Sequence, residues 1–327
     1  MTYKNENIID KKTLKLIMKN NIFLKRQQKK QALLALIFLI PVLVALTVST
    51  LIPSVYNIII SFTNYGLNHY FEFDFIGFKN YIKIFSLNSN SPFFPVLGWT
   101  LVWMFVGTIL NYFLGMLLAI FFNNPNLKER NIYRSLLIIP WALPGVIAIQ
   151  MWHGMLGTDG VFNQILNLFG IHSVSWLNSV FWSRFWVIIV NAWLSFPYFM
   201  TITYAALQSI PDELYEAADI DGAGKFYKFR RITFPLLNKT LAPLIITQFA
   251  FQFNNFNLIY LLTNGGPRNS LGNYFGSTDI LVSYTFNIMR ELQQYGLTAA
   301  YGVITFILTI FIIVISTFSI KGLKEEF

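Results

Sequence analysis

The sequence of 327 residues contains no cysteine and only three histidines. The absence of cysteine excludes disulfides and thiolate-bound metals. His69, His153 and His172 are scattered along the chain, so packing or surface roles are expected for them. No nucleophile stands near a candidate base either. The sequence therefore predicts no catalytic residue and no metal site in this chain.

A phosphate-binding loop is also missing. GAGKF at 222–226 places glycine and lysine side by side, yet no GxxxxGK pattern precedes it. Phe226 stands where a P-loop requires Ser or Thr. We therefore expect no ATP and no other cofactor to be bound by this chain.

Charge is scarce, at 12% of the residues, while 55% are hydrophobic. This balance is typical of membrane proteins. A bilayer core about 30 Å thick requires about 20 apolar residues in a spanning helix. None of the 15 acidic residues lies inside the apolar stretches, where a charge would cost about 2.5–3.5 kcal/mol. The sequence thus predicts an all-α integral membrane protein with six transmembrane helices, near 33–61, 98–122, 135–156, 185–208, 240–262 and 298–320.

The basic residues indicate the orientation. Nineteen of the 24 Lys and Arg residues lie in 1–31, 123–134, 209–239 or after 320. By the positive-inside rule, both termini and the 209–237 loop are expected on the cytoplasmic side of a bacterial cell membrane. The net charge of +9 is then mainly an orientation signal, and the basic residues favour contact with membrane lipid over binding of nucleic acid.

Two regions are predicted by composition. Residues 1–31 form a basic cytoplasmic tail, which can lie on the inner leaflet as an amphipathic helix or remain disordered. Residues 32–327 form the transmembrane domain. Pro41 and Pro53 fall within its first span, where a kink or break is expected.

The 209–237 loop is polar, and its pattern predicts two short helices. Ser209 and Asp212 have the spacing of a capping box, and Gly222 provides the turn. Such a helix could be a simple interfacial element, or it could insert into a groove on another protein.

Two polar stripes run along the fourth and fifth spans. Each has spacing i, i+4 and i+7, which places its members on one helix face. Uncharged amides and hydroxyls both donate and accept hydrogen bonds, which suits a neutral polyhydroxyl solute. The same residue types also form hydrogen bonds between membrane helices, so this alternative stays open. The two stripes are Asn191, Ser195 and Tyr198, and Gln248, Gln252 and Asn255.

The loop carries a recognisable pattern. Glu216-Ala217-Ala218, Gly222 and Ile232-x-Phe234-Pro235 resemble the EAA loop of membrane subunits of ABC importers, with Phe234 in place of the usual Leu. In that family this loop is a coupling helix that docks on a separate ATPase subunit. The resemblance therefore implies a coupling role for Glu216, Ala217, Ala218, Asp221 and Gly222.

The resemblance extends over about residues 32–320. IIPWALPGVIAIQMW (138–152), FAFQFNNFNLIYLLTNGGP (249–267) and STDILVSYTF (277–286) are similar to permease subunits of the maltose and maltodextrin (MalF) type. This implies the type I ABC importer permease fold. It also implies sugar contacts at Asn191, Leu194, Ser195, Tyr198, Gln248, Phe251, Gln252 and Asn255. Ser195, Gln248 and Gln252 differ from the residues of that family and reshape the pocket.

The resemblance implies several partners. These are a second homologous permease subunit in a heterodimer, a dimer of ATPase subunits that binds ATP and Mg, and an extracytoplasmic solute-binding protein. The expected substrate is an oligosaccharide, with maltodextrin favoured and a raffinose-type sugar or a sugar-polyol as the alternative. For Asn264-Gly265-Gly266-Pro267, a simple outer turn and a contact with the solute-binding protein are both open.

Two other classes agree less well with the sequence. A transporter driven by an ion gradient is expected to carry an acidic or histidine relay inside its spans, and no acidic residue lies there. An enzyme acting on lipid-linked sugars should show paired carboxylates or a metal constellation at one membrane face. The acidic cluster here is the coupling loop instead.

Overall fold

The computed structural model describes residues 11–86, 92–124, 126–268 and 275–325. In these ranges the chain is helical, with two isolated β-bridges and no strand. The prediction of an all-α protein is confirmed. The chain divides into two compact units, Met1–Asn57 and Ile58–Phe327.

The first unit consists mainly of one long helix, α1 (Lys11–Leu46). Residues 1–10 of the basic tail lie outside the described residues. The boundary drawn at residue 31 falls inside α1, so the tail from Lys11 onward continues directly into the first span.

The two prolines of this span behave differently. Pro41 lies inside α1, whereas Pro53 follows a π-helical turn at Thr47–Leu51, which leads into α2 (Ile52–Ile60). Proline has no N–H to donate to the carbonyl of Ser49. The chain therefore closes a wider turn here, in which the Ile52 N–H donates to the Thr47 carbonyl.

The second unit is a helical bundle with short elements at both ends. Its long helices are α4 (Phe93–Phe122), α8 (Val180–Gln208), α11 (Phe234–Phe253) and α14 (Tyr295–Glu325). Its shorter helices are α3 (Lys79–Phe85), α5 (Arg130–Ala142), α6 (Gly145–Met155), α7 (Val161–Leu168), α9 (Glu213–Ile220), α10 (Lys225–Lys228), α12 (Phe256–Thr263) and α13 (Leu281–Asn287). A 3-10 turn lies at Leu67–His69, and π-helical turns lie at Phe229–Thr233 and Ile288–Leu292.

Four helical segments of the described chain are long and apolar enough to cross a membrane: Gln27–Ile60, Phe93–Phe122, Val180–Gln208 and Tyr295–Phe318. A fifth is added if α5 and α6, which meet at 90°, form one broken span. This pair covers the span expected at 135–156. The span expected at 240–262 is divided between α11 and α12, because the helix stops at Asn254 and restarts at Phe256.

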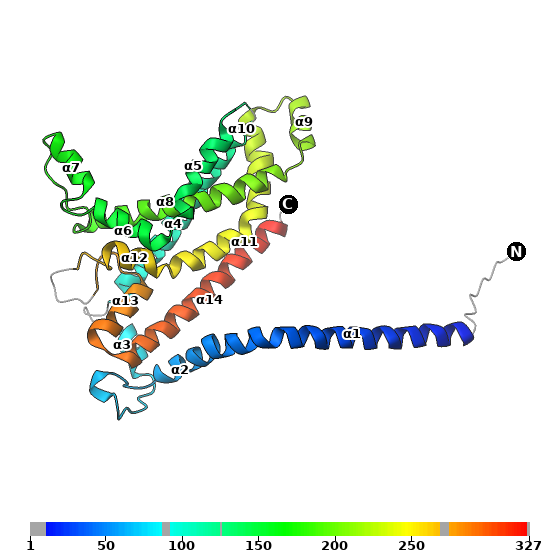
Figure 1. The fold of residues 1–327 in the computed structure, drawn as a ribbon, viewed down its shortest axis with the longest axis horizontal. Coiled ribbons are helices and arrows are strands. Elements are labelled where there is room, and N and C mark those ends of the chain that lie inside the picture. Colours follow the sequence, from blue (N-terminus) through cyan, green and yellow to red (C-terminus); the bar gives the residue numbers. More distant parts are fainter. Residues whose placement is uncertain (1–10, 87–91, 125, 269–274, 326–327) are drawn as a thin grey trace. The chain divides into compact units, whose positions relative to one another are not determined.

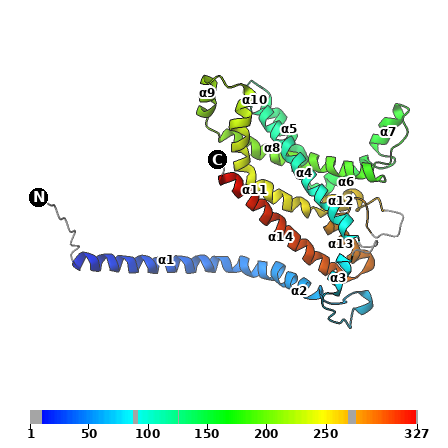
Figure 2. The same cartoon turned by 180° about the vertical axis from the view of Figure 1, so that it is seen from behind.

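The centre of the second unit is built on α4. α8 and α11 both pack against it, and close packing is possible because Gly115 of α4 lies against the backbone of Phe199 and Met200 in α8. Figures 1 and 2 show that α9 and the C-terminal end of α14 lie at one end of this bundle, and α3 and α13 at the other. The predicted coupling loop and the end of the last helix thus share one side.

Candidate transport and coupling site

The polar stripe of α8 lies partly inside the bundle. Asn191 is 1% exposed, and its Nδ2 donates to Oδ1 of Asn111 in α4 at 3.4 Å. Ser195 and Tyr198, one and two turns further along, are half-buried, as is Leu194. The predicted face of α8 therefore runs from the buried core toward the surface of the chain.

The stripe of α11 is divided in the same way. Gln252 is fully buried, with 0% exposure, whereas Gln248 is half-buried and Phe251 is 60% exposed. Asn255 is half-buried and lies at the break between α11 and α12, where it is the N-cap residue of α12. The break places this amide at the end of a helix rather than along its side.

The two stripes meet at Gly107 of α4. A Cβ atom at this position would lie 2.8 Å from Nε2 of Gln252 and 3.2 Å from Nδ2 of Asn191. The structure thus brings one amide from each stripe together at the glycine. The hydrogen bond of Asn191 to Asn111 also shows that the helix-to-helix role left open for the stripe applies to Asn191.

Trp141 is a further candidate for the site that the sequence did not predict. This residue lies at the end of α5, is exposed, and its ring centroid is 6.0 Å from that of Tyr198. It offers a second aromatic surface beside the half-buried part of the α8 stripe. The available signal was an aromatic residue between two prolines in IPWALP, where helix α5 ends and the chain bends.

The residues expected to couple to an ATPase are on the surface. Glu216 and Ala217 lie on α9, Asp221 is its C-cap residue, and Ala217 and Asp221 are exposed; Glu216 is also exposed, whereas Ala218 is half-buried. Gly222, with φ of 74°, makes the turn after α9 in a conformation that disfavours other residues. The prediction of a helix followed by a glycine turn is confirmed.

The predicted capping box is wrong. Ser209 Oγ donates to the Ala206 carbonyl at 2.8 Å, which closes the end of α8 instead of starting α9. Asp212 is the N-cap of α9, and its side chain makes no capping hydrogen bond. Its carbonyl accepts the N–H of Glu216, which begins the helix.

Two side-chain contacts hold α9 against α10 and against the residue that precedes α11. The hydroxyls of Tyr215 and Thr233 are 2.8 Å apart, and Lys228 Nζ lies 2.6 Å from Oδ1 of Asp219. Tyr215 packs against a cluster to which α4, α8 and α11 all contribute buried residues, including Met116 and Phe199. The exposed helix is thus connected mechanically to the helices that carry the polar stripes.

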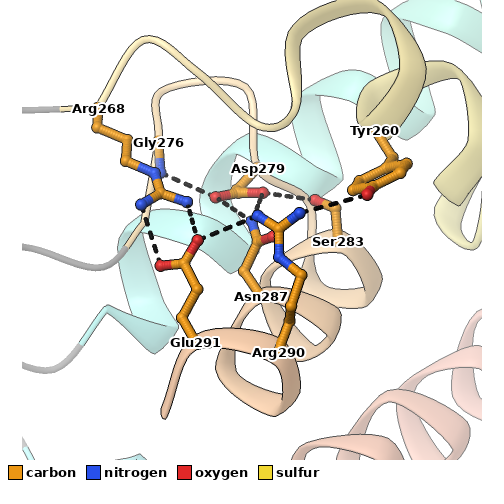
Figure 3. A network of polar contacts seen from close by, with 8 residues as sticks. All are labelled: Tyr260, Arg268, Gly276, Asp279, Ser283, Asn287, Arg290 and Glu291. Carbon is orange, nitrogen blue, oxygen red and sulfur yellow. Dashed lines mark hydrogen bonds and ion pairs between the residues drawn. The ribbon is translucent and has the colours of Figure 1, made fainter.

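At the other end, Asp279 organises the segment between α12 and α13 (Figure 3). Its carboxylate is 1% exposed and accepts the Gly276 N–H at 2.8 Å, Ser283 Oγ at 2.7 Å and Asn287 Nδ2 at 3.2 Å. Burial raises the pKa of the Asp279 carboxyl, and the hydrogen bonds from Gly276 and Ser283 oppose this shift. Asp279 therefore ties this loop to α13.

A second part of Figure 3 is an exposed ion cluster. Arg268 Nη1 donates to Glu291 at 3.0 Å, and Arg290 Nη2 donates to Glu291 at 3.1 Å. The hydrogen bond from Arg268 lowers the pKa of the Glu291 carboxyl. Asn264 and Gly265, with φ of 49° and 77°, form a turn at the NGGP stretch, and the contact with a solute-binding protein left open for this stretch stays a hypothesis.

Comparison with known proteins identifies the family to which the chain is similar. Residues 111–325 match the family model described as the binding-protein-dependent transport system inner membrane component. The galactooligosaccharide transport system permease protein of Bacillus subtilis is 41% identical over 295 residues, which cover 88% of this chain and 70% of that protein. The maltodextrin transport system permease protein of the same organism is 36% identical over 298 residues, covering 87% and 68%.

A third relative is longer. The maltose/maltodextrin transport system permease protein of Salmonella typhimurium is 45% identical over 240 residues, which cover 71% of this chain and 46% of that protein. Among solved structures, a chain of a bacterial ABC transporter involved in the import of alginate superposes with a TM-score of 0.77 at 22% identity, covering 91% of this chain and 98% of that one. This structural likeness supports the importer permease fold. The extensive matches in sequence show that the chain belongs to the family of inner membrane components of binding-protein-dependent transport systems, and that it is a multi-pass membrane protein.

Proposed function

We propose that this chain is the permease subunit of an ABC importer that moves a neutral oligosaccharide across a bacterial cell membrane. The observation that carries the proposal is the joint placement of two features. Uncharged polar residues of α8 and α11 converge at Gly107, and the exposed helix α9 packs on the same bundle.

The chemistry of the candidate site favours a neutral solute. Its eight residues present amides, a hydroxyl, a phenol and apolar side chains, without a charge. Amides can donate and accept, as sugar hydroxyls do, and aromatic rings such as Phe251 and Trp141 suit the C–H faces of a sugar ring. An anionic solute would lack a cationic partner among these residues.

The coupling surface supports a separate ATPase. α9 exposes Glu216, Ala217 and Ile220, and Ile220 is 88% exposed. Phe226, on the following helix α10, is 73% exposed. An exposed apolar patch with charged neighbours is typical of a surface that another protein covers. The proposed partner is an ATPase dimer that binds ATP and Mg, so that this chain is non-catalytic and has no cofactor of its own.

Two further partners complete the proposed assembly. A second homologous permease subunit would form the other half of the pathway, and an extracytoplasmic binding protein would deliver the sugar. In the proposed mechanism, closure of the ATPases moves α9, the bundle opens outward, and the sugar passes to the polar stripes. Hydrolysis then returns the bundle to its inward-open state.

The relatives favour two classes of oligosaccharide, beside the raffinose-type sugar or sugar-polyol that the sequence leaves as an alternative. The similarity to maltodextrin permeases favours an α-glucan. The resemblance to the maltose type implies the same, since by that resemblance five of the eight expected contact residues keep the family's residue types: Asn191, Leu194, Tyr198, Phe251 and Asn255. The 41% identity to a galactooligosaccharide permease favours a galactoside instead. Ser195, Gln248 and Gln252 depart from the maltose-type pattern, and we propose that they influence which sugar is preferred.

The test is uptake of labelled maltotriose and of a labelled galactooligosaccharide by cells that contain this chain with its partner subunits. ATP-dependent uptake that an excess of the same unlabelled sugar blocks is the expected result, and the better substrate identifies the class. Uptake that survives ATP depletion and collapses with the ion gradient would refute the ABC importer assignment. The matched control is the same cell lacking only this chain.

A further inference from the structure

Where α4, α8 and α11 meet, several buried polar atoms have no hydrogen-bond partner among the described residues. Among the residues that the structure describes, neither Oε1 nor Nε2 of the fully buried Gln252 has a hydrogen-bond partner. Nδ2 of Asn111 and Oγ1 of Thr108 lack one as well. Buried polar groups in native proteins are nearly always paired, so this cluster requires a physical explanation.

Packing alone does not explain it. Gln252 is held in position through its backbone, because its backbone carbonyl accepts a hydrogen bond from Nε1 of the buried Trp103 at 3.0 Å. Its side chain adds no contact that an apolar residue of similar volume would not make. A purely structural site would therefore be more stable with Leu or Met at this position.

The space that admits the amide comes from α4. Gly107 leaves room for the ends of Gln252 and Asn191, and Asn111, one turn further on, accepts the hydrogen bond from Asn191. Gly107, Asn111 and Gly115 are four residues apart and share one face of α4. The recess is thus part of the face that packs against α8.

We propose that Gly107 and Asn111 are positioning residues for transport: they hold the amides of Asn191 and Gln252 in a withdrawn position, from which the amides reach the sugar only when α11 parts from α4. This inference rests on the proposed function. It adds that the two stripes are not presented to the solute as a fixed surface. The half-buried Gln248, Ser195 and Tyr198 form the permanent part of the site, and the withdrawn amides form the part that depends on the transport state.

The withdrawn state has a free-energy cost, because a buried amide is left without hydrogen-bond partners in the described part of the chain. The withdrawn state leaves both polar atoms of the Gln252 amide without a hydrogen-bond partner among the described residues, so sugar hydroxyls gain more from this amide once it is released than from groups already paired within the protein. If the complete site exists only part of the time, its apparent affinity for sugar is reduced by the fraction of time for which it exists. The lower affinity helps the sugar to leave on the inner side.

The first test uses the absence of cysteine, because Gln252→Cys introduces the only thiol of the chain. The complete complex in lipid vesicles is treated with a charged, membrane-impermeant methanethiosulfonate, at rest and after trapping with ATP, vanadate and sugar-free binding protein. Labelling of this chain is followed by its mass. The expected result is a labelling rate that rises by about tenfold or more on trapping, because opening changes the accessible population.

Asn191→Cys is the second probe, and the half-buried Gln248→Cys is the matched control, for which a smaller change is expected. Labelling of the Gln252→Cys and Asn191→Cys variants that is equally slow in the two states overturns the proposal, since neither position would then become accessible when the bundle opens. Labelling that is already fast at rest also overturns it, because the amides would not be withdrawn.

The second test adds one methyl group to the recess. Gly107→Ala places Cβ against both amides, whereas Gly98→Ala on the same helix meets no atom within 4 Å and is the matched control. We expect Gly107→Ala to raise the sugar-independent ATPase rate of the complex by about threefold or more, because it destabilises the withdrawn state. Wild-type rates for Gly107→Ala would refute the positioning role.

If Gly107→Ala prevents assembly, combining it with Gln252→Ala removes the side chain that the methyl meets and should restore assembly; failure to restore it counts against the proposal. Failure of the proposed function has a different signature, namely no ATP-dependent oligosaccharide uptake by the wild-type complex. Failure of this inference is unchanged labelling in a complex that does transport sugar.

Discussion

Replacing Gln252 by Leu should stabilise the resting protein while it impairs transport. The side chain is fully buried, and neither of its polar atoms has a partner among the described residues. Leaving a buried polar group unpaired costs about 1–3 kcal/mol in water-soluble proteins. The value is smaller in a bilayer, where measured hydrogen bonds between helices average about 0.6 kcal/mol. We therefore expect a gain of about 1 kcal/mol for Gln252→Leu.

The assay is thermal unfolding of the purified complex, followed by the fluorescence of the eight Trp residues of this chain. A gain of this size corresponds to an increase in Tm of about 2–4 °C for a chain of about 150–250 residues, and somewhat less here. Gln248→Leu, one turn earlier and half-buried, is the matched control and should leave Tm nearly unchanged. Uptake should fall for Gln252→Leu. A decrease in Tm of that variant would refute the reasoning, because it would show that the amide is paired in the protein.

Three further predictions follow from the two ends of the bundle. Glu216→Lys should abolish uptake with membrane insertion intact, whereas Glu72→Lys on the outer segment should not; normal uptake by the first variant would remove the coupling role. Asp279→Ala should lower stability by about 2–4 kcal/mol, because it leaves Gly276 N–H and the Asn287 amide without their acceptor; an unchanged Tm would contradict this. The lowered pKa of Glu291 means that its ion pair contributes stability above the ordinary pKa of Glu, about 4.3, and that this contribution is lost as pH falls through the lower folded value. Arg268→Gln should therefore weaken the dependence of the free energy of unfolding on pH below the ordinary pKa of Glu. At neutral pH it should cost no more than about 1 kcal/mol, since the pair is exposed. A loss of stability at acid pH as steep as that of the wild type would contradict the assignment.

Helical periodicity predicted which polar residues share a face, but it could not predict their burial. Asn191 and Gln252 are withdrawn because Gly107 on another helix leaves room for them. A glycine in an apolar stretch has many possible roles, and its neighbours in space come from parts of the chain 84 or more residues away. The state-dependent part of the site was therefore beyond the reach of local patterns.

The breaks within the predicted spans have local causes. Leu143 precedes Pro144 and adopts an extended backbone with ψ of 143°, which is the conformation favoured before proline. Helices α5 and α6 therefore meet at 90° in a stretch that apolar composition alone predicts as one span. In the fifth stretch, the adjacent Asn254 and Asn255 end one helix and begin the next. Composition thus located the apolar segments, while proline and asparagine divided them.

The arrangement of the packing also indicates which helix moves. Gly115 brings α4 against the backbone of α8, so these two helices form a closely packed pair. In contrast, α11 continues directly from α10 and the π-helical turn Phe229–Thr233, and its start is bonded to α9 through Tyr215 and Thr233. A displacement of α9 by a partner therefore acts first on α11, and through it on Gln252, while Gly107 stays with the α4–α8 pair. The moving helices α9 and α11 are thus separate from the α4–α8 pair that carries Gly107. Because of this separation, motion at one end of the bundle can expose the Gln252 amide in its centre.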